Sequence, residues 1–203
     1  MKVSFMITCL GDVFFPEVGV AVVKLLRRLG VTVEFPEGQT CCGMPLYNSG
    51  YHDDAAAVAA RTLDVFAGAE HVVVPSGSCA WMVKAEYPGL LAHDSRRQKA
   101  AQELAARTRE LSQFLVEVMG IERVASSFQG KVTYHDSCHL LRGLAESRSP
   151  RTLLQGVPGV ELIVGGGVRG PSDLAALEKA GCDAVLVATA LYDGRLQPSD
   201  LKT

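Results

Sequence analysis

The feature that most restricts the fold of this chain is the regular alternation of short apolar runs with amphipathic segments. The runs predicted as strands are Lys2 to Thr8, Val31 to Phe35, His71 to Pro75, Lys131 to His135, Glu161 to Val164 and Ala184 to Ala188. The segments predicted as helices are Glu17 to Leu29, Asp53 to Ala67, Ser95 to Met119, Arg151 to Leu154 and Ser172 to Ala180. Such alternation is typical of βαβ units. We therefore expect an α/β fold with a doubly wound, mostly parallel sheet and helices on both faces.

Composition excludes several classes of protein. With 203 residues, of which 48% are hydrophobic, the chain can bury a core in one domain or two small ones. Its net charge of -2 offers no field for polyanions, so we expect no nucleic-acid partner. No apolar run approaches the roughly 20 residues of a membrane span, and no cleavage site follows the apolar N-terminus. A cytoplasmic location is expected.

Six cysteines bear most directly on function. Cys9 directly follows the first predicted strand, Cys41 and Cys42 follow the second, Cys79 the third and Cys138 the fourth. Ligands of doubly wound sheets gather where strands end, and reduced cytoplasmic thiols favour metal binding or redox chemistry over disulfides. The alternative is that these cysteines are buried apolar residues, and this is the interpretation we adopt for Cys182, at a helix-to-strand junction.

The chemistry of thiolates limits the kinds of metal that these cysteines could bind. Thiolates are soft ligands that select iron-sulfur clusters, zinc or copper, and convergent sulfurs from separate loops are typical of clusters. Adjacent cysteines such as Cys41 and Cys42 seldom form a disulfide with each other, whereas two neighbouring metal atoms can use both. Gly43, the next residue, lets the backbone approach a bound group without a Cβ atom in the way.

Four segments carry a family resemblance, namely TCLGDVFFPEVG, QTCCGMPLYNSGY, VVVPSGSCAWMVK and KVTYHDSCHLLRGL. They resemble the cysteine-rich CCG domain of the B-type heterodisulfide reductase subunits, and most closely the A-type lactate-utilisation proteins, relatives of the glycolate oxidase iron-sulfur subunit. The resemblance implies a Rossmann-like CCG domain over residues 1–163 with a [4Fe-4S] cluster or, alternatively, a zinc ion. The metal ligands it implies are Cys9, Cys41, Cys42, Cys79 and Cys138.

Two departures from that family pattern matter. Met82 stands where the full motif has its last cysteine, so a five-thiolate site would lack one ligand, although four thiolates suffice for an ordinary cluster or for zinc. Cys138 resembles the first cysteine of a second CCG copy whose remaining cysteines are missing. Cys138 is then an orphan, a ligand borrowed by the first site, or a free thiol.

Two histidines flank Cys138. His135 and His139, with Asp136 between them, could lower the pKa of Cys138, orient a substrate acid or complete a Cys/His zinc site. The two histidines are therefore our candidate catalytic residues. Alternatively, Asp136 or Ser137 caps the following turn and the histidines are ordinary surface residues.

From about residue 164 the sequence pattern changes. Residues 164–195 resemble the last quarter of the phosphate-binding (βα)8 barrels of the histidine-biosynthesis isomerases, which implies a weak phosphate site at Gly166, Gly167, Ala188 and Thr189. The alternative is a purely structural glycine turn. We predict that residues 164–203 form a barrel-like βαβ fragment that extends the same parallel sheet. A quarter barrel cannot close, so isomerase activity is not expected.

The resemblance implies an oxidoreductase role, as an iron-sulfur electron-transfer subunit of a lactate (2-hydroxy acid) oxidation complex. Its expected partners are other iron-sulfur and redox subunits of that complex. Apolar surface left by the missing second motif also favours a homo-oligomer. Two alternatives stay open, a zinc- or phosphate-binding module without turnover and an inactive chimera of two families.

Overall fold

A computed structural model describes residues 1–165 and 168–200 of the chain. The chain forms two compact units. The first unit contains Met1–Met119 and, after an excursion, Cys138–Glu146; the second contains Gly120–Ser137 and Ser147–Thr203. The predicted boundary between residues 163 and 164 lies within the second unit, and as a division of the chain it stays a prediction.

The first unit is built on a four-stranded parallel sheet. Its strands are β1 (Lys2–Phe5), β2 (Thr32–Glu34), β3 (Val72–Val74) and β4 (Thr108–Glu110). Their order is β2-β1-β3-β4, with Val3 opposite Val33 and Ser4 opposite Val72. Strands are thus added on both sides of β1, as in a doubly wound fold.

Helices connect and cover these strands. They are α1 (Cys9–Phe14), α2 (Pro16–Arg28), α3 (Met44–Asn48), α4 (His52–Val65), α5 (Gly77–Trp81), α6 (Tyr87–Leu90), α7 (Ser95–Arg107) and α8 (Leu111–Gln113). Three π-helical turns complete the unit, η1 (Met82–Glu86), η2 (Phe114–Val118) and η3 (His139–Gly143). The α/β class with parallel pairing is therefore confirmed.

One predicted helix is wrong in its extent. The helix predicted over Ser95 to Met119 ends at Arg107, because Thr108–Glu110 pairs with β3 as the strand β4. Thr108 is fully buried, and its hydroxyl donates to the carbonyl oxygen of Leu104 at 2.8 Å. The segment has helical periodicity, but pairing with β3 overrides that local preference.

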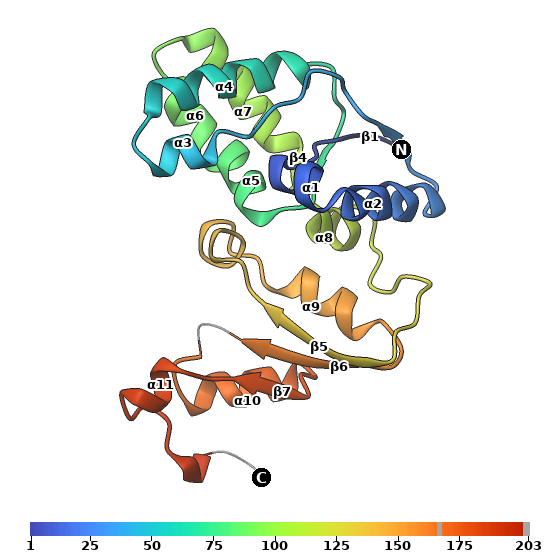
Figure 1. Ribbon diagram of the computed structural model, residues 1–203, viewed down its shortest axis with the longest axis vertical. Helices are drawn as coiled ribbons and strands as arrows, with labels where there is room; N and C mark the ends of the chain where they lie inside the picture. Colours follow the sequence, from blue (N-terminus) through green and yellow to red (C-terminus); the bar gives the residue numbers. More distant parts are fainter. Residues whose placement is uncertain (166–167, 201–203) are drawn as a thin grey trace. The chain divides into compact units, whose positions relative to one another are not determined.

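The second unit has a three-stranded parallel sheet of order β5-β6-β7 (Figure 1). Its elements are β5 (Gly130–His135), α9 (Arg148–Gln155), β6 (Val160–Gly165), α10 (Pro171–Lys179), β7 (Ala184–Leu186), α11 (Thr189–Tyr192) and the 3-10 turn η4 (Pro198–Asp200). Tyr134 lies opposite Val164, and Ile163 opposite Ala184. The predicted βαβ fragment is present as β6, α10 and β7, in a sheet separate from that of the first unit.

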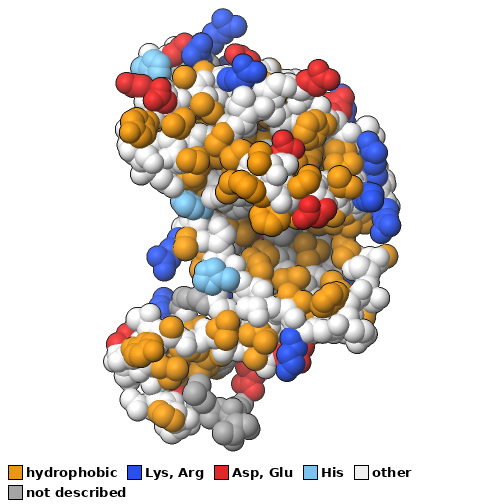
Figure 2. All heavy atoms as spheres, in the orientation of Figure 1, with side chains coloured by type: hydrophobic (Ala, Val, Ile, Leu, Met, Phe, Trp, Pro, Cys, Tyr) orange, Lys and Arg blue, Asp and Glu red, His pale blue; other side chains and the backbone are white. Residues whose placement is uncertain are grey.

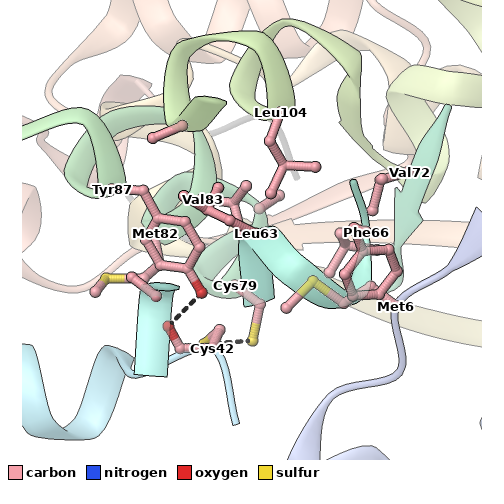
Figure 3. Close-up of a cluster of buried hydrophobic side chains, with 14 of the residues drawn as sticks. Met6, Cys42, Leu63, Phe66, Val72, Cys79, Met82, Val83, Tyr87 and Leu104 are labelled. Carbon is pink, nitrogen blue, oxygen red and sulfur yellow. Dashed lines mark hydrogen bonds between the residues drawn. The ribbon is translucent and has the colours of Figure 1, made fainter. Parts of the chain in front are cut away.

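The core of the first unit is a cluster of buried aliphatic and aromatic side chains (Figure 3). It includes Phe66, Met82 and Tyr87, and it also includes Cys42 and Cys79. Hydrophobic side chains also reach the surface (Figure 2), among them Leu10, Val13, Phe14, Phe15, Val18 and Val20 of the segment that contains α1 and α2. None of the helices in the described residues is long and apolar enough to cross a membrane.

Candidate metal centre

Four of the predicted ligands meet at one edge of the first sheet. Cys9 is the first residue of α1, after β1; Cys41 and Cys42 precede α3, after β2; Cys79 lies in α5, after β3. The carboxyl ends of parallel strands share an edge, so these three connections bring their sulfurs together. The sulfurs are arranged in two pairs.

The inner pair is buried. The Sγ atom of Cys42 donates to Sγ of Cys79 across 3.2 Å, and the two residues are 3% and 8% exposed (Figure 3). The Tyr87 hydroxyl holds the backbone beside them, with its oxygen 2.9 Å from the carbonyl oxygen of Cys42 and 3.2 Å from the hydroxyl of Thr62. Hydrogen bonds therefore fix the inner pair within a hydrophobic core.

The outer pair is half-buried. Sγ of Cys9 lies 3.6 Å from Sγ of Cys41, which also accepts a hydrogen bond from the backbone N–H of Gly43 at 3.4 Å. The hydroxyl of Thr8 accepts from the backbone N–H of Gly11 and so caps the helix that starts at Cys9. A pocket of about 300 Å³, lined in part by Cys9, Phe15 and Ser76, opens on the Cys9 side of this pair.

Gly43 has a conformational reason to be glycine. Its φ of 86° is left-handed, a conformation that costs other residues roughly 1–2 kcal/mol. It is the N-cap residue of α3 and turns the chain directly after Cys42, so that Cys41 and Cys42 have different partners. The structure thus shows a tight turn at Gly43, while a close approach of its backbone to a bound group stays a prediction.

The inner pair has unequal acidities. The hydrogen bond to Cys79 and burial both raise the pKa of the Cys42 thiol. The hydrogen bond from Cys42, helped by the hydroxyls of Ser76 and Ser78, lowers the pKa of Cys79 to about 7 although burial opposes this. In the outer pair, burial and the hydrogen bond to Cys41 raise the pKa of Cys9. Within the inner pair, Cys79 is thus the sulfur better stabilised as a thiolate.

The donor set suits a thiophilic metal, since four thiols from three connections are the ligands that iron-sulfur clusters and structural zinc use. The geometry is that of pairs. Within residues 1–165 and 168–200, no three Cys, His, Asp or Glu side chains converge as a ready metal site.

The segment carrying Cys138 belongs to the first unit. Cys138 is exposed, and the ring of His139 packs against Trp81 of α5 with ring centroids 4.7 Å apart. Gly143 lies so close that a Cβ atom there would be 2.2 Å from the indole ring of Trp81. The segment is thus seated on the helix that holds Cys79, although Cys138 as a metal ligand stays a prediction.

The other histidine lies in the second unit. His135 is exposed at the end of β5, and the neighbouring Asp136 is buried in an ion pair with Arg151. The motif around Cys138 is therefore divided between the two units, and its carboxylate pairs with an arginine. Cys182 is half-buried in the second unit, where burial raises its pKa.

The predicted phosphate site is described only in part. Gly166 and Gly167 lie outside the described residues. Ala188 and Thr189 are exposed at the start of the short helix α11. Phosphate binding at these four residues stays a prediction.

Sequence reasoning missed two residues of the site. Tyr87 is fully buried and bonds the backbone of Cys42 from 45 positions away, and no local pattern marks that contact. Ser76 caps the helix of Cys79, and the serine that opens SGSCAW is a usable N-cap signal.

Comparisons with known proteins agree with this geometry. Residues 3–84, which hold the four paired cysteines, match the CCG family, described as a cysteine-rich domain. Residues 146–197 match the family described as histidine biosynthesis protein. The fold and the sulfurs at its sheet edge thus define a cysteine-rich domain of the CCG class.

Curated relatives identify the family more closely. The chain is 55% identical over 162 residues to lactate utilization protein A of Halalkalibacterium halodurans, covering 80% of this chain and 66% of that protein. It is 51% identical over 163 residues to the protein of the same name from Geobacillus thermodenitrificans, covering 80% and 68%. The chain belongs to the lactate utilization protein A family. It spans about two thirds of the length of these relatives.

Proposed function

We propose that this chain is an iron-sulfur electron-transfer subunit that serves the oxidation of lactate or a related 2-hydroxy acid. The observation that carries the proposal is the meeting of four cysteine sulfurs, in two pairs, at the carboxyl edge of the first sheet. The relatives' printed name supplies the lactate-utilisation context. Other iron-sulfur and redox subunits are the partners that such a role requires.

A bound [4Fe-4S] cluster supplies one-electron transfer at a potential that its surroundings adjust. The chain's own residues would bind and bury it. Cys42 and Cys79 would hold it from the hydrophobic core, and Cys9 and Cys41 from the half-exposed side. The backbone N–H of Gly43 donates a hydrogen bond to the Cys41 sulfur. Hydrogen bonds of this kind raise the reduction potential of a bound cluster.

The test is metal analysis of the full chain after anaerobic reconstitution with iron and sulfide. We expect about four iron and four sulfide per chain with broad visible absorption, since four thiolates can hold one cubane cluster. Cys41→Ser or Cys79→Ser should lose most of the iron, whereas the matched control Cys182→Ser should keep it.

Two outcomes would contradict the proposal. A colourless chain that binds one zinc at the same cysteines and rejects iron would make the site structural. A chain that binds neither metal would leave an inactive chimera. Cys138→Ser further decides whether Cys138 is a ligand, because only a ligand's loss lowers the iron content.

A further inference from the structure

The two sulfur pairs can do chemistry without a metal. Four cysteines allow three disulfide connectivities. The structure favours one of them, because Cys42 lies 3.2 Å from Cys79 while Cys9 lies 3.6 Å from Cys41. We propose that the metal-free site is a double dithiol–disulfide couple, with Cys42 joined to Cys79 and Cys9 to Cys41 when oxidised.

Neighbouring residues hold the cysteines in these two pairs. Tyr87 fixes the backbone of Cys42, and Ser76 caps the helix that presents Cys79. The left-handed turn at Gly43 directs the neighbouring Cys41 toward Cys9 instead. Because the two adjacent cysteines have different sulfur partners, at 3.6 Å for Cys41 and 3.2 Å for Cys42, the vicinal disulfide and the crossed pairing are both disfavoured.

The reaction balances with a small disulfide such as oxidised glutathione as the oxidant. A cysteine thiolate attacks the glutathione S–S bond, forming a mixed disulfide and releasing one glutathione thiol. The partner cysteine then attacks the protein sulfur of the mixed disulfide, forming the protein disulfide and releasing the second glutathione. Two protein thiols are oxidised, and one glutathione disulfide is reduced to two thiols.

Exposure sets the order of the two closures. The outer pair is half-buried beside a pocket of about 300 Å³, which gives a small disulfide a path to Cys9. The inner pair, 3% and 8% exposed, is reached only when the surrounding core opens. The outer pair should therefore close first.

Oxidation would remove every thiolate that a metal needs, so the couple would control loading of the site. This regulatory consequence rests on the proposed function, whereas the pairing itself does not.

The experiment uses the full chain, freed of metal, reduced and then exposed to oxidised glutathione without oxygen. Cys138→Ser/Cys182→Ser is the background, so that only the four paired cysteines remain. Mass spectrometry should show the loss of four hydrogen atoms per chain, reversed by dithiothreitol. The Cys9–Cys41 link should appear before the Cys42–Cys79 link.

Single variants in that background assign the partners, since Cys41 and Cys42 share a peptide. Cys41→Ser should form only the Cys42–Cys79 link and lose two hydrogen atoms. Cys42→Ser should form only the Cys9–Cys41 link. Three results would overturn the inference: a link between Cys9 and Cys79, a Cys41–Cys42 link in the Cys138→Ser/Cys182→Ser chain without further substitution, or glutathione adducts alone.

Iron reconstitution of the reduced and the oxidised chain separates the two proposals. We expect the oxidised chain to lose the iron binding of the reduced chain, and dithiothreitol to restore it. If the reduced chain binds iron but the links do not form, this inference fails and the proposed function stands. If the links form but the reduced chain binds no iron, the function fails and the pairing stands.

Discussion

The two units of this chain are stabilised in different ways. The first unit has a large buried cluster in which aliphatic, aromatic and sulfur side chains pack together. Among its described residues, the second buries few apolar side chains, including Leu162, Val164, Ala190 and Leu196, and its helix α10 has no buried residue. It relies instead on polar contacts such as the buried Asp136–Arg151 ion pair. The cysteine site therefore lies in the unit whose geometry is set by packing.

This contrast can be tested because Trp81, the single tryptophan, lies in the first unit. Its fluorescence reports unfolding of that unit, and far-ultraviolet circular dichroism reports both units.

The largest expected effect is that of Phe66→Ala in the first unit. Phe66 is 2% exposed within the core cluster, so its truncation should cost about 3–5 kcal/mol of unfolding free energy. Urea unfolding followed by Trp81 fluorescence measures this cost. The matched control is Phe128→Ala in the second unit, where the ring is 53% exposed and the transition should not move. Equal effects of the two variants would remove the contrast.

The next effect is that of Asp136→Ala in the second unit. Its side chain is 1% exposed, and its loss leaves the Arg151 charge without this partner, at a cost of about 3 kcal/mol. We expect the circular dichroism transition to move to lower urea while the Trp81 transition keeps its midpoint. Asp193→Asn, at an exposed pair with Arg195, is the control. A shift of the Trp81 transition by Asp136→Ala would show that the two units unfold together.

A smaller effect is expected for Tyr87→Phe. The ring stays in the core, but the carbonyl oxygen of Cys42 loses its buried donor, which should cost about 1–2 kcal/mol. Alkylation of Cys42 in the native, metal-free chain should also become faster, as peptide mass spectrometry can measure. Tyr192→Phe, at a side chain that is 93% exposed, is the control. Unchanged stability and alkylation would mean that Tyr87 does not hold the site.

The smallest effect is expected for Gly43→Ala. A Cβ atom there meets only ordinary contacts, the nearest being 3.5 Å away, so the cost is that of the left-handed backbone, about 1 kcal/mol. Gly89→Ala is the control, because Gly89 has no left-handed backbone and has open space around it. Its urea midpoint, followed by Trp81 fluorescence, should not decrease. If both variants behave alike, the turn at Gly43 is not required for the site.

Much of this fold could be predicted from the sequence because the strands of a parallel sheet are local apolar runs. All six predicted strands are present, and the connections after three of them, including the helices α1 and α5, supply the four paired cysteines. The strand β4 could not be found this way. Thr108–Glu110 lies in a segment with helical periodicity, and only its pairing with β3 makes it a strand.

The site was predictable in its residues but not in its arrangement. Strand ends brought Cys9, Cys41, Cys42 and Cys79 together, yet the division into an inner and an outer pair depends on burial and on Tyr87. The return of Cys138–Glu146 to the first unit is a long-range contact without a local signal. The motif around Cys138 is therefore a single cluster in the sequence, although the structure divides it.

The return of that segment has a consequence for where the chain can accept an insertion. It ends at Glu146, the residue at which the match to the histidine biosynthesis family begins. The last helical turn of the first unit ends at Gly143, and the next helix starts at Arg148 in the second. The stretch between Gly143 and Arg148 holds no strand or helix, so a segment inserted there would interrupt none of the elements that the cysteine-bearing unit packs.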